Sequence, residues 1–374
     1  MSCELKSRFF SGQGLTHSMP AKKTIMPHSV LPAYGLEEKS LTVETFGSGL
    51  INNTWKVTAS GNEYILQRLN HAVFKEPTNI ANNISLIGAY LRKNHPDYKF
   101  VSPVISSEGD EMIFQKDKGY FRMFPFVAGS HSKDTVETPK QAYEAATQFG
   151  RFTRLLHGID IERLKITIPC FHDLTLRHQQ FLLALEKGNK QRIDESGSLI
   201  KSLASHMDIV TEYGYIKTNP EFKLRVTHHD TKISNVLFDN AGNGLCVIDL
   251  DTVMPGYFIS DVGDMMRTYL SPLSEEESDF EKIIIRDEFY KAIVEGYYNE
   301  MKNELTETEK KYFFYSGTFM IYMQAIRFFT DYLNDDVYYG AKYPKQNFIR
   351  AKNQIVLLEE LLKKKEQLQN IIEV

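Results

Sequence analysis

The sequence predicts an α+β protein in which a small antiparallel β lobe with one helix precedes a large, mainly α-helical lobe. Three observations predict this architecture: strand-like alternation fills residues 41–124, Pro125 ends it, and segments with a helical period fill most of the remaining chain. A length of 374 residues also favours two lobes, because single cores rarely grow so large. We expect the N-terminal lobe over residues 37–125 and the C-terminal lobe over residues 126–374.

The composition is that of an ordinary globular protein, with 42% hydrophobic and 25% charged residues. A formal net charge of −4 gives no indication of a nucleic-acid partner or of an anionic membrane surface. The three cysteines lie far apart, which is typical of reduced thiols and predicts a cytoplasmic protein. The longest apolar run, residues 312–326, is too short to span a bilayer and predicts a buried helix.

Residues 1–36 have a different texture from the rest of the chain. They contain three prolines, and Glu4 is their only acidic residue. Their hydrophobic residues follow neither a helical nor a strand period. We therefore expect this segment to be a disordered or loosely attached extension.

The β lobe is expected to begin with three antiparallel strands, over residues 41–46, 51–58 and 64–69. Apolar residues recur at three- and four-residue steps over residues 78–93, which predicts an amphipathic helix that ends before His95 and Pro96. Further strands are expected over residues 101–105, 112–115 and 120–124. In the second lobe, helices are expected over residues 138–157, 174–187, 198–213, 288–299, 306–330 and 348–368.

A polar loop in the second lobe carries the candidate chemistry. Asp230 opens the loop, Asn235 closes it, and residues 236–248 are expected to form a short hairpin. If the hairpin forms, Asn235 lies opposite Ile248 and therefore beside Asp249. The hairpin then brings an amide oxygen and a carboxylate to one point, which suits Mg²⁺.

The spacing His228-x-Asp230-x4-Asn235 matches the catalytic loop of protein kinases at all three fixed positions. Phosphoryl transfer needs a carboxylate that accepts the proton of the attacking hydroxyl, and ligands for a metal that bridges the nucleotide phosphates. We predict Asp230 as the catalytic base, with Asn235 and Asp249 as metal ligands. Lys232 lies next to the base, where a cation can stabilise charge on the transferring phosphoryl group.

Three residues near the base have structural interpretations as well. Asp251 follows two residues after Asp249, so it either assists the metal or joins the hydrogen bonds of the loop. His228 is expected to brace the loop, and His229 is expected to be solvated.

A pair of glycines joins the first two strands, where a kinase loop would cover the nucleotide phosphates. The Walker A lysine pattern is absent there, which disfavours a P-loop NTPase. The third strand offers Gln67 and Arg68 in place of the kinase lysine, and alternation alone leaves open which of them faces the nucleotide. The candidate nucleotide-binding residues are Gly47, Gly49, Asn53, Thr54, Arg68, Phe124 and Phe126, the last two in an expected hinge.

The segment from His228 to Gly256 resembles the aminoglycoside phosphotransferase (APH) family of small-molecule kinases. The resemblance lies in His228 to Asn235 and in the run Val247-Ile-Asp-Leu-Asp-Thr-Val-Met-Pro-Gly256. Further segments are similar to the N-acetylhexosamine 1-kinase branch of the family, namely residues 52–57, 64–71, 261–264 and 327–334 with Tyr338.

The resemblance implies a protein-kinase-like two-lobe fold, with ATP held between the lobes and Mg²⁺ as cofactor. It implies phosphorylation of the anomeric 1-hydroxyl of N-acetylglucosamine or N-acetylgalactosamine, and Arg327 and Tyr338 match positions that contact the sugar. Two alternatives stay open. The same fold can phosphorylate an aminoglycoside, choline or another amino-alcohol, or it can be a non-catalytic nucleotide-binding module, against which the intact Asp230, Asn235 and Asp249 argue.

Overall fold

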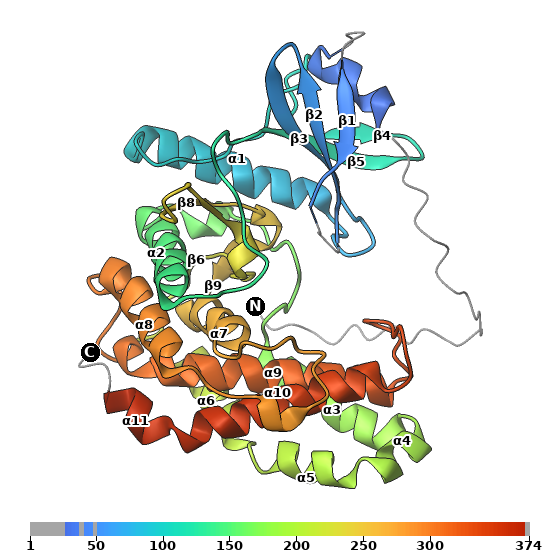
Figure 1. Ribbon diagram of the computed structural model, residues 1–374, viewed down its shortest axis with the longest axis vertical. Coiled ribbons are helices and arrows are strands. Elements are labelled where there is room, and N and C mark those ends of the chain that lie inside the picture. The colour runs from blue at the N-terminus through green and yellow to red at the C-terminus, as the bar shows by residue number, and fades with distance from the viewer. Residues whose placement is uncertain (1–26, 37–40, 48–50, 371–374) are drawn as a thin grey trace. The chain divides into compact units, whose positions relative to one another are not determined.

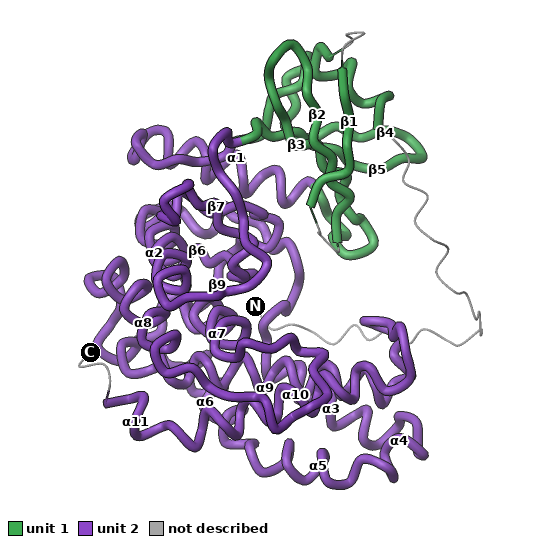
Figure 2. Tube along the Cα trace, viewed as in Figure 1, with its two compact units in different colours: residues 1–77, 102–126 green, residues 78–101, 127–374 purple. Residues whose placement is uncertain are grey.

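The computed structural model describes residues 27–36, 41–47 and 51–370, which belong to two compact units (Figure 1 and Figure 2). Unit 1 comprises the chain up to Pro77 together with Ser102–Phe126, and unit 2 comprises the rest. Unit 1 holds a five-stranded antiparallel sheet and unit 2 is mainly helical. The predicted fold class is therefore confirmed.

Unit 1 is built on a sheet with the strand order β1-β2-β3-β5-β4. Its strands are β1 (Thr42–Thr45), β2 (Asn53–Ala59), β3 (Asn62–Arg68), β4 (Ile113–Gln115) and β5 (Gly119–Pro125). The tight turn between β2 and β3 uses Ser60 and Gly61, both with positive φ (48° and 78°). Residues 101–105 form no strand, because Pro103 cannot donate to a ladder, although the N–H of Val104 donates a hydrogen bond to the carbonyl of Met123 in β5 (2.7 Å).

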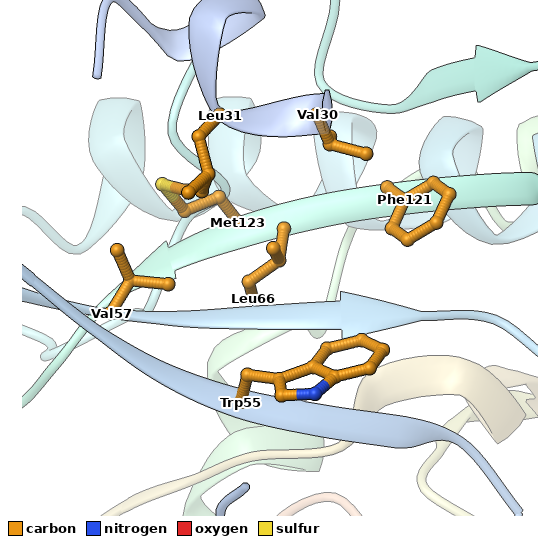
Figure 3. Close-up of a cluster of buried hydrophobic side chains, with 7 residues drawn as sticks. All are labelled: Val30, Leu31, Trp55, Val57, Leu66, Phe121 and Met123. Carbon is orange, nitrogen blue, oxygen red and sulfur yellow. The ribbon is translucent and has the colours of Figure 1, made fainter. Parts of the chain in front are cut away.

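One face of this sheet carries a buried core (Figure 3). The core consists of Val30, Leu31, Trp55, Val57, Leu66, Phe121 and Met123, each at most 2% exposed. Val30 and Leu31 come from a short 3-10 helix, His28–Tyr34, that packs on the strands. The expectation of a loosely attached segment is therefore wrong for residues 28–34, because two of their side chains complete this core. Residues 1–26 of that segment lie outside the described residues.

Unit 2 contains helices and two small antiparallel sheets, β6–β9 and β7–β8. The short strands are β6 (Arg225–Thr227), β7 (Val236–Phe238), β8 (Gly244–Val247) and β9 (Met254–Gly256). The helices are α1 (Pro77–Asn94), α2 (Pro139–Leu155), α3 (Leu174–Lys187), α4 (Lys190–Glu195), α5 (Gly197–Ala204), α6 (Asp208–Thr218), α7 (Phe258–Tyr269), α8 (Asp287–Met301), α9 (Phe313–Leu333), α10 (Gln346–Lys363) and α11 (Lys365–Asn370). The two helices expected over residues 198–213 and 348–368 are each divided in two.

Helix α1 clusters with unit 2, apart from its first residue, although the sequence places it in the N-terminal lobe. Asn83, which is fully buried, explains this placement. Its Nδ2 donates to the carbonyl oxygens of Lys165 (2.8 Å) and Val253 (2.9 Å), and the N–H of Lys165 donates to its Oδ1 (2.8 Å). These buried hydrogen bonds attach the helix to loops of unit 2.

Helix α9 lies at the centre of unit 2, where it packs against α3, α7 and α10. It contains most of the apolar run 312–326, and nearly all of its residues are buried. The prediction of a buried helix is therefore confirmed. Among the residues that the structure describes, no helix is both long and apolar enough to cross a membrane.

The close approach of α7 to α9 gives a stability prediction. A Cβ added to Gly263 in α7 would lie 2.8 Å from Cβ of Met320 and would strike the carbonyl of Ser316, whereas Gly214 in α6 has nothing within 4 Å. We expect Gly263→Ala to lower the free energy of unfolding by about 1–3 kcal/mol. We expect Gly214→Ala to raise it by about 0.4–1 kcal/mol. Denaturant titrations measure both variants, and equal effects would contradict this packing.

Candidate active site

The loop from His228 to Asn235 leaves β6 and enters β7. The hairpin expected over residues 236–248 is confirmed, since β7 pairs with β8. The N–H of Ile248 donates to the carbonyl of Asn235 (2.9 Å), so these two residues lie opposite each other as predicted. The sequence alone therefore places the end of the loop correctly against the start of the segment that carries Asp249.

Asp230 and Lys232 lie side by side in this loop. Oδ2 of Asp230 is 3.3 Å from Nζ of Lys232, and the two side chains are 22% and 49% exposed. Burial lowers the pKa of Lys232, but the carboxylates of Asp230, Asp264 and Asp249 outweigh it, so the pKa is raised and the side chain stays cationic. The arrangement leaves an accessible carboxylate beside a positive charge, as a general base with an electrostatic helper requires.

Asn235 and Asp249 bring oxygen atoms to adjacent strand ends. Nδ2 of Asn235 donates to the carbonyl of Asp230 (2.8 Å), which turns its Oδ1 the other way. Asp249 has φ 60° and ψ 60°, a left-handed conformation that is uncommon for residues with a side chain and that clusters at functional sites. Amide and carboxylate oxygens are ligands that Mg²⁺ accepts, so the residues present fit the ion. Their role as metal ligands stays a prediction.

Asp251 differs from Asp249 in its surroundings. Asp251 is 3% exposed and lies in a 3-10 turn, Leu250–Thr252, whereas Asp249 is exposed. Thr252 of the same turn donates from Oγ1 to the carbonyl of His228 (2.7 Å). This burial favours the interpretation in which Asp251 belongs to the network that supports the loop.

His228 supports the loop from inside. Its Nε2 donates to the carbonyl of Ile248 (2.9 Å), and its ring lies edge-on to Phe149 with the centroids 5.1 Å apart. Because a carbonyl only accepts, Nε2 carries the proton and Nδ1 faces the N–H of Asp230 (3.4 Å). Burial lowers the pKa of His228, in keeping with a neutral ring. These are the contacts of the bracing residue that the sequence predicts.

His229 is 5% exposed, so the expectation that it is solvated is wrong. Its Nε2 lies 2.8 Å from Oγ1 of Thr227, whose hydroxyl donates to the carbonyl of Met254 (3.2 Å). Nε2 is therefore the donor, and Nδ1 accepts from Nδ1 of His172 (3.3 Å). Burial lowers the pKa of His229 to about 3, which keeps the ring neutral. A side chain at Gly256 would strike this ring, so the glycine is required for the fit.

Two buried aspartates of α7 hold the loop by its backbone. The carboxylate of Asp261 accepts from the N–H groups of His228 (3.0 Å) and His229 (2.7 Å), and Oδ2 of Asp264 accepts from the N–H of Thr231 (2.8 Å). The sequence does not predict that these aspartates bind the loop backbone. It identifies residues 261–264 only as a segment similar to the N-acetylhexosamine 1-kinase branch. Their spacing of three residues, which places both on one face of a helix, was the available signal.

The buried carboxyl group of Asp261 predicts a pH dependence of stability. Burial raises the pKa of Asp261 from 3.8 to about 7. The unfolded chain loses this proton near pH 4 and the folded protein near pH 7, so stability falls as the pH rises between these values and levels off above them. Between pH 5.5 and 7, we expect the free energy of unfolding of the wild type to fall by up to about 2 kcal/mol relative to Asp261→Asn. Denaturant titrations at both pH values test this, and a difference that is independent of pH would contradict it.

The predicted nucleotide-binding residues of unit 1 are divided between the two faces of its sheet. Asn53 pairs with Arg68, and Thr54 pairs with Gln67. Because successive residues of a strand face opposite sides, Asn53 and Arg68 share the face of the core in Figure 3. Thr54 and Gln67 share the other face. The structure therefore places the candidates Asn53 and Arg68 on the opposite face from the candidate Thr54.

The face of Thr54 and Gln67 also carries an arginine that the sequence analysis does not single out. Arg122 in β5 is 1% exposed, and its Nε and Nη2 donate to Oε1 of Gln67 (3.0 Å and 2.8 Å). Phe124 lies on the same face, with its ring centroid 5.0 Å from the guanidinium carbon of Arg122. Arg122 on the neighbouring strand β5 therefore places a positive charge beside Gln67. A protein kinase instead carries a lysine on the third strand itself.

Phe126 completes this face next to a second cation. Nζ of Lys56 lies 4.3 Å from the ring centroid of Phe126, and the ring of Phe46 packs edge-on against it at 6.0 Å. Gly47 follows directly with φ 74°, and Gly49 lies outside the described residues. Aromatic and cationic side chains therefore gather on the face that carries Thr54, Phe124 and Phe126.

The two predicted acceptor residues lie around Tyr339 in unit 2. The guanidinium carbon of Arg327 lies 5.7 Å from the ring centroid of Phe171 and 5.6 Å from that of Tyr339. Nη1 of Arg327 donates to Oε1 of Gln324 (3.2 Å). Tyr338 is 70% exposed, and its ring packs edge-on against Tyr339 with the centroids 4.8 Å apart. The structure therefore brings Arg327 and Tyr338 to one region.

Phe171 and His172 connect this region to the catalytic loop. The ring of Phe171 stacks on that of His172, with the centroids 4.3 Å apart. Nδ1 of His172 lies 3.3 Å from Nδ1 of His229, the residue before the predicted base. Arg177 in α3 donates from Nη2 to the carbonyl of Phe171 (3.3 Å), and burial and then the charge of Arg327 lower its pKa. Sequence reasoning misses this connection because the segments lie far apart in the chain.

Solved structures of small-molecule kinases share this fold. An aminoglycoside phosphotransferase from Alicyclobacillus acidocaldarius has a TM-score of 0.62 and 13% identity, over 94% of this chain and 99% of that one. A microcompartment-associated aminopropanol kinase has a TM-score of 0.60 and 16% identity, over 91% and 97%. An amicoumacin kinase, solved with AMP-PNP and Ca²⁺, has a TM-score of 0.59 and 15% identity, over 91% and 93%. The chain thus has the predicted protein-kinase-like fold.

The phosphotransferase enzyme family APH matches residues 42–301. This range begins at β1 and ends with α8, so it includes the sheet of unit 1, the catalytic loop and both aspartates of α7. Arg327 and Tyr338 lie beyond it. The chain therefore belongs to the APH phosphotransferase family and is an ATP-dependent kinase of a small molecule.

Proposed function

We propose that the protein transfers the γ-phosphoryl group of ATP to the anomeric 1-hydroxyl of N-acetylglucosamine or N-acetylgalactosamine. Asp230 accepts the hydroxyl proton while the sugar oxygen bonds to phosphorus, the bond to the β-phosphate oxygen breaks, and ADP leaves. Asn235 and Asp249 hold Mg²⁺, which neutralises phosphate charge when bound. Lys232 stabilises the negative charge on the phosphoryl group during its transfer.

The observation that carries the acceptor assignment is the chemistry around Arg327. Among the residues that the structure describes, neither Arg177 nor Arg327 forms an ion pair with a carboxylate. Aromatic surface around these arginines comes from Phe171, Tyr338 and Tyr339. Aromatic rings stack on the apolar face of a sugar, and guanidinium groups donate to hydroxyl and acetamide oxygens. Such a lining favours an oxygen-rich neutral acceptor over a cationic one.

Two acidic runs, residues 275–277 and 335–336, would suit a cationic acceptor, but at least one carboxylate of each run is already paired with arginine. Glu275 pairs with Arg267 (3.0 Å) and with Arg350, and Asp336 pairs with Arg192 (2.6 Å). A protonated amine would have to compete with arginines that already hold these carboxylates. This arrangement supports the sugar over an amino-alcohol.

An amine-bearing acceptor is the second candidate, because the similar structures include aminoglycoside and aminopropanol kinases. A shared fold does not fix the acceptor, since one fold hosts many substrates. The amino-alcohol therefore remains the specific rival, and a non-catalytic module is disfavoured by the complete catalytic loop.

A panel of acceptors distinguishes the candidates. Purified protein is incubated with ATP, Mg²⁺ and N-acetylglucosamine, N-acetylgalactosamine, their methyl glycosides, choline, aminopropanol or an aminoglycoside, and ADP release is measured. We expect release with the free sugars and none with the methyl glycosides, which lack a 1-hydroxyl. Release only with amines would overturn the sugar assignment, and nucleotide binding without release from any acceptor would favour the module.

A further inference from the structure

The loop between α9 and α10 presents two exposed apolar side chains on a fixed backbone. Val337 and Tyr338 are 83% and 70% exposed. Asp331, which is 4% exposed near the end of α9, accepts from the N–H of Tyr338 (2.7 Å) and from that of Tyr339 (2.9 Å). We call residues 335–340 the acceptor loop. The side chains of this loop are exposed, but its backbone is fixed by hydrogen bonds to a buried carboxylate. Such a loop differs from a mobile surface connection.

Asn347 in α10 fixes the acceptor loop from within unit 2. It is fully buried, and its Nδ2 lies 3.1 Å from Oδ2 of Asp331, 2.9 Å from Oδ1 of Asp336 and 3.0 Å from the carbonyl of Gly340. One amide group thereby joins the helix end, the start of the loop and its last residue.

A second set of contacts fixes the same loop from α4. Nη1 of Arg192 donates to Oδ2 of Asp336 (2.6 Å), and Nδ2 of Asn189 donates to Oδ1 of Asp335 (2.8 Å). Asp335 and Asp336 both have φ 61°, a left-handed conformation that aspartate adopts more readily than most residues. The contacts from Arg192 and Asn189 hold the loop in this conformation.

We propose that Asp331 and Asn347 are positioning residues that fix Tyr338 for binding of the acceptor, a role that rests on the proposed function of Tyr338 as an acceptor contact. A ring held in place before binding spares the acceptor the entropy loss of ordering the loop. The neighbouring Tyr339 extends the effect, because Nε2 of Gln324 lies 3.3 Å from its hydroxyl and Gln324 also binds Arg327. Fixing the loop thus fixes both predicted sugar contacts.

The test compares two buried asparagines of the same helix. Asn347→Ala removes the links to the acceptor loop, whereas Asn353→Ala removes hydrogen bonds to the carbonyls of Ser274 and Glu277 (both 3.2 Å), away from that loop. For whichever acceptor the wild type phosphorylates, we expect Asn347→Ala to raise the acceptor KM about tenfold, with kcat and the KM for ATP unchanged within about twofold. Asn353→Ala should leave all three constants unchanged. An equal rise in both variants, or none in Asn347→Ala, would overturn the proposal.

A double-mutant cycle shows whether Asn347 acts through Tyr338. In a Tyr338→Ala background, the further change Asn347→Ala should raise the acceptor KM less than twofold, because the ring to be positioned is gone. A full additional tenfold rise would contradict the proposal. If Asn347→Ala does not fold, Arg192→Leu, at the loop's other anchor, takes its place in both experiments. A wild type that turns over an amine instead of a sugar would refute the proposed acceptor, while the KM comparison would still decide this inference.

Discussion

Replacing Asp230 by asparagine lowers kcat by about 10²- to 10⁴-fold, the usual share of a general base. The fold should survive, because the carbonyl of Asp230, and not its carboxylate, holds Asn235. Asparagine keeps the shape of the side chain but cannot accept the proton of the acceptor hydroxyl. The measurement is ADP release at saturating ATP, Mg²⁺ and acceptor, together with the melting temperature of each protein.

The control for this variant is Asp239→Asn in the turn of the nearby hairpin. Among the residues that the structure describes, the side chain of Asp239 accepts hydrogen bonds only from its own turn, from the N–H groups of Ala241 and Asn243 and from the side chain of Asn243. We expect its replacement to leave kcat within about twofold. Turnover by Asp230→Asn within tenfold of the wild type would show that Asp230 is not the base. Loss of folding in that variant would show a structural role instead.

Replacing Asp249 by asparagine should lower kcat by at least about 10²-fold and raise the Mg²⁺ concentration needed for half-maximal rate. Asparagine tolerates the left-handed backbone of this position (φ 60°), so the hairpin should keep its shape. The loss of activity therefore reports the removal of the negatively charged carboxylate that binds Mg²⁺. Titrations of activity with Mg²⁺ at fixed ATP measure the effect.

Asp251→Asn provides the matched comparison two residues away. Because Asp251 is buried and Asp249 is exposed, we expect Asp251→Asn to lower the melting temperature while the half-maximal Mg²⁺ concentration stays unchanged. If Asp251→Asn shifted the Mg²⁺ dependence and Asp249→Asn did not, the two aspartates would have exchanged roles. That outcome would contradict the proposed metal site.

The catalytic loop was predictable because its information is local. The motif from His228 to Asn235 and the hairpin behind it lie within a short stretch, and turn chemistry fixes their pairing. The same holds for the strands β2 and β3, whose alternation and turn residues are plain in the sequence. Local patterns therefore predicted the fold class and the centre of the candidate site.

The supports of that loop were not predictable for a physical reason. The polar residues of α7 recur at helical spacing, but this spacing does not show that Asp261 and Asp264 are buried or that they accept hydrogen bonds from the loop backbone. The 3-10 helix at His28–Tyr34 is too short for a period, and two buried side chains attach it to the sheet. Alternation shows that Arg68 and Gln67 face opposite sides of the sheet, but only the strand pairing and the position of the core show which side each of them faces. Contacts such as His172 with His229 arise only when the chain folds.

The most direct test of the proposed phosphoryl transfer to the sugar follows phosphorus itself. A ³¹P NMR spectrum is recorded while the protein consumes ATP in the presence of Mg²⁺ and N-acetylglucosamine. We expect the γ-phosphate signal to be lost and a phosphomonoester signal, split by the anomeric proton, to grow in an amount equal to that of ADP. Growth of inorganic phosphate alone, or an unchanged ATP spectrum with every acceptor, would contradict the proposed transfer.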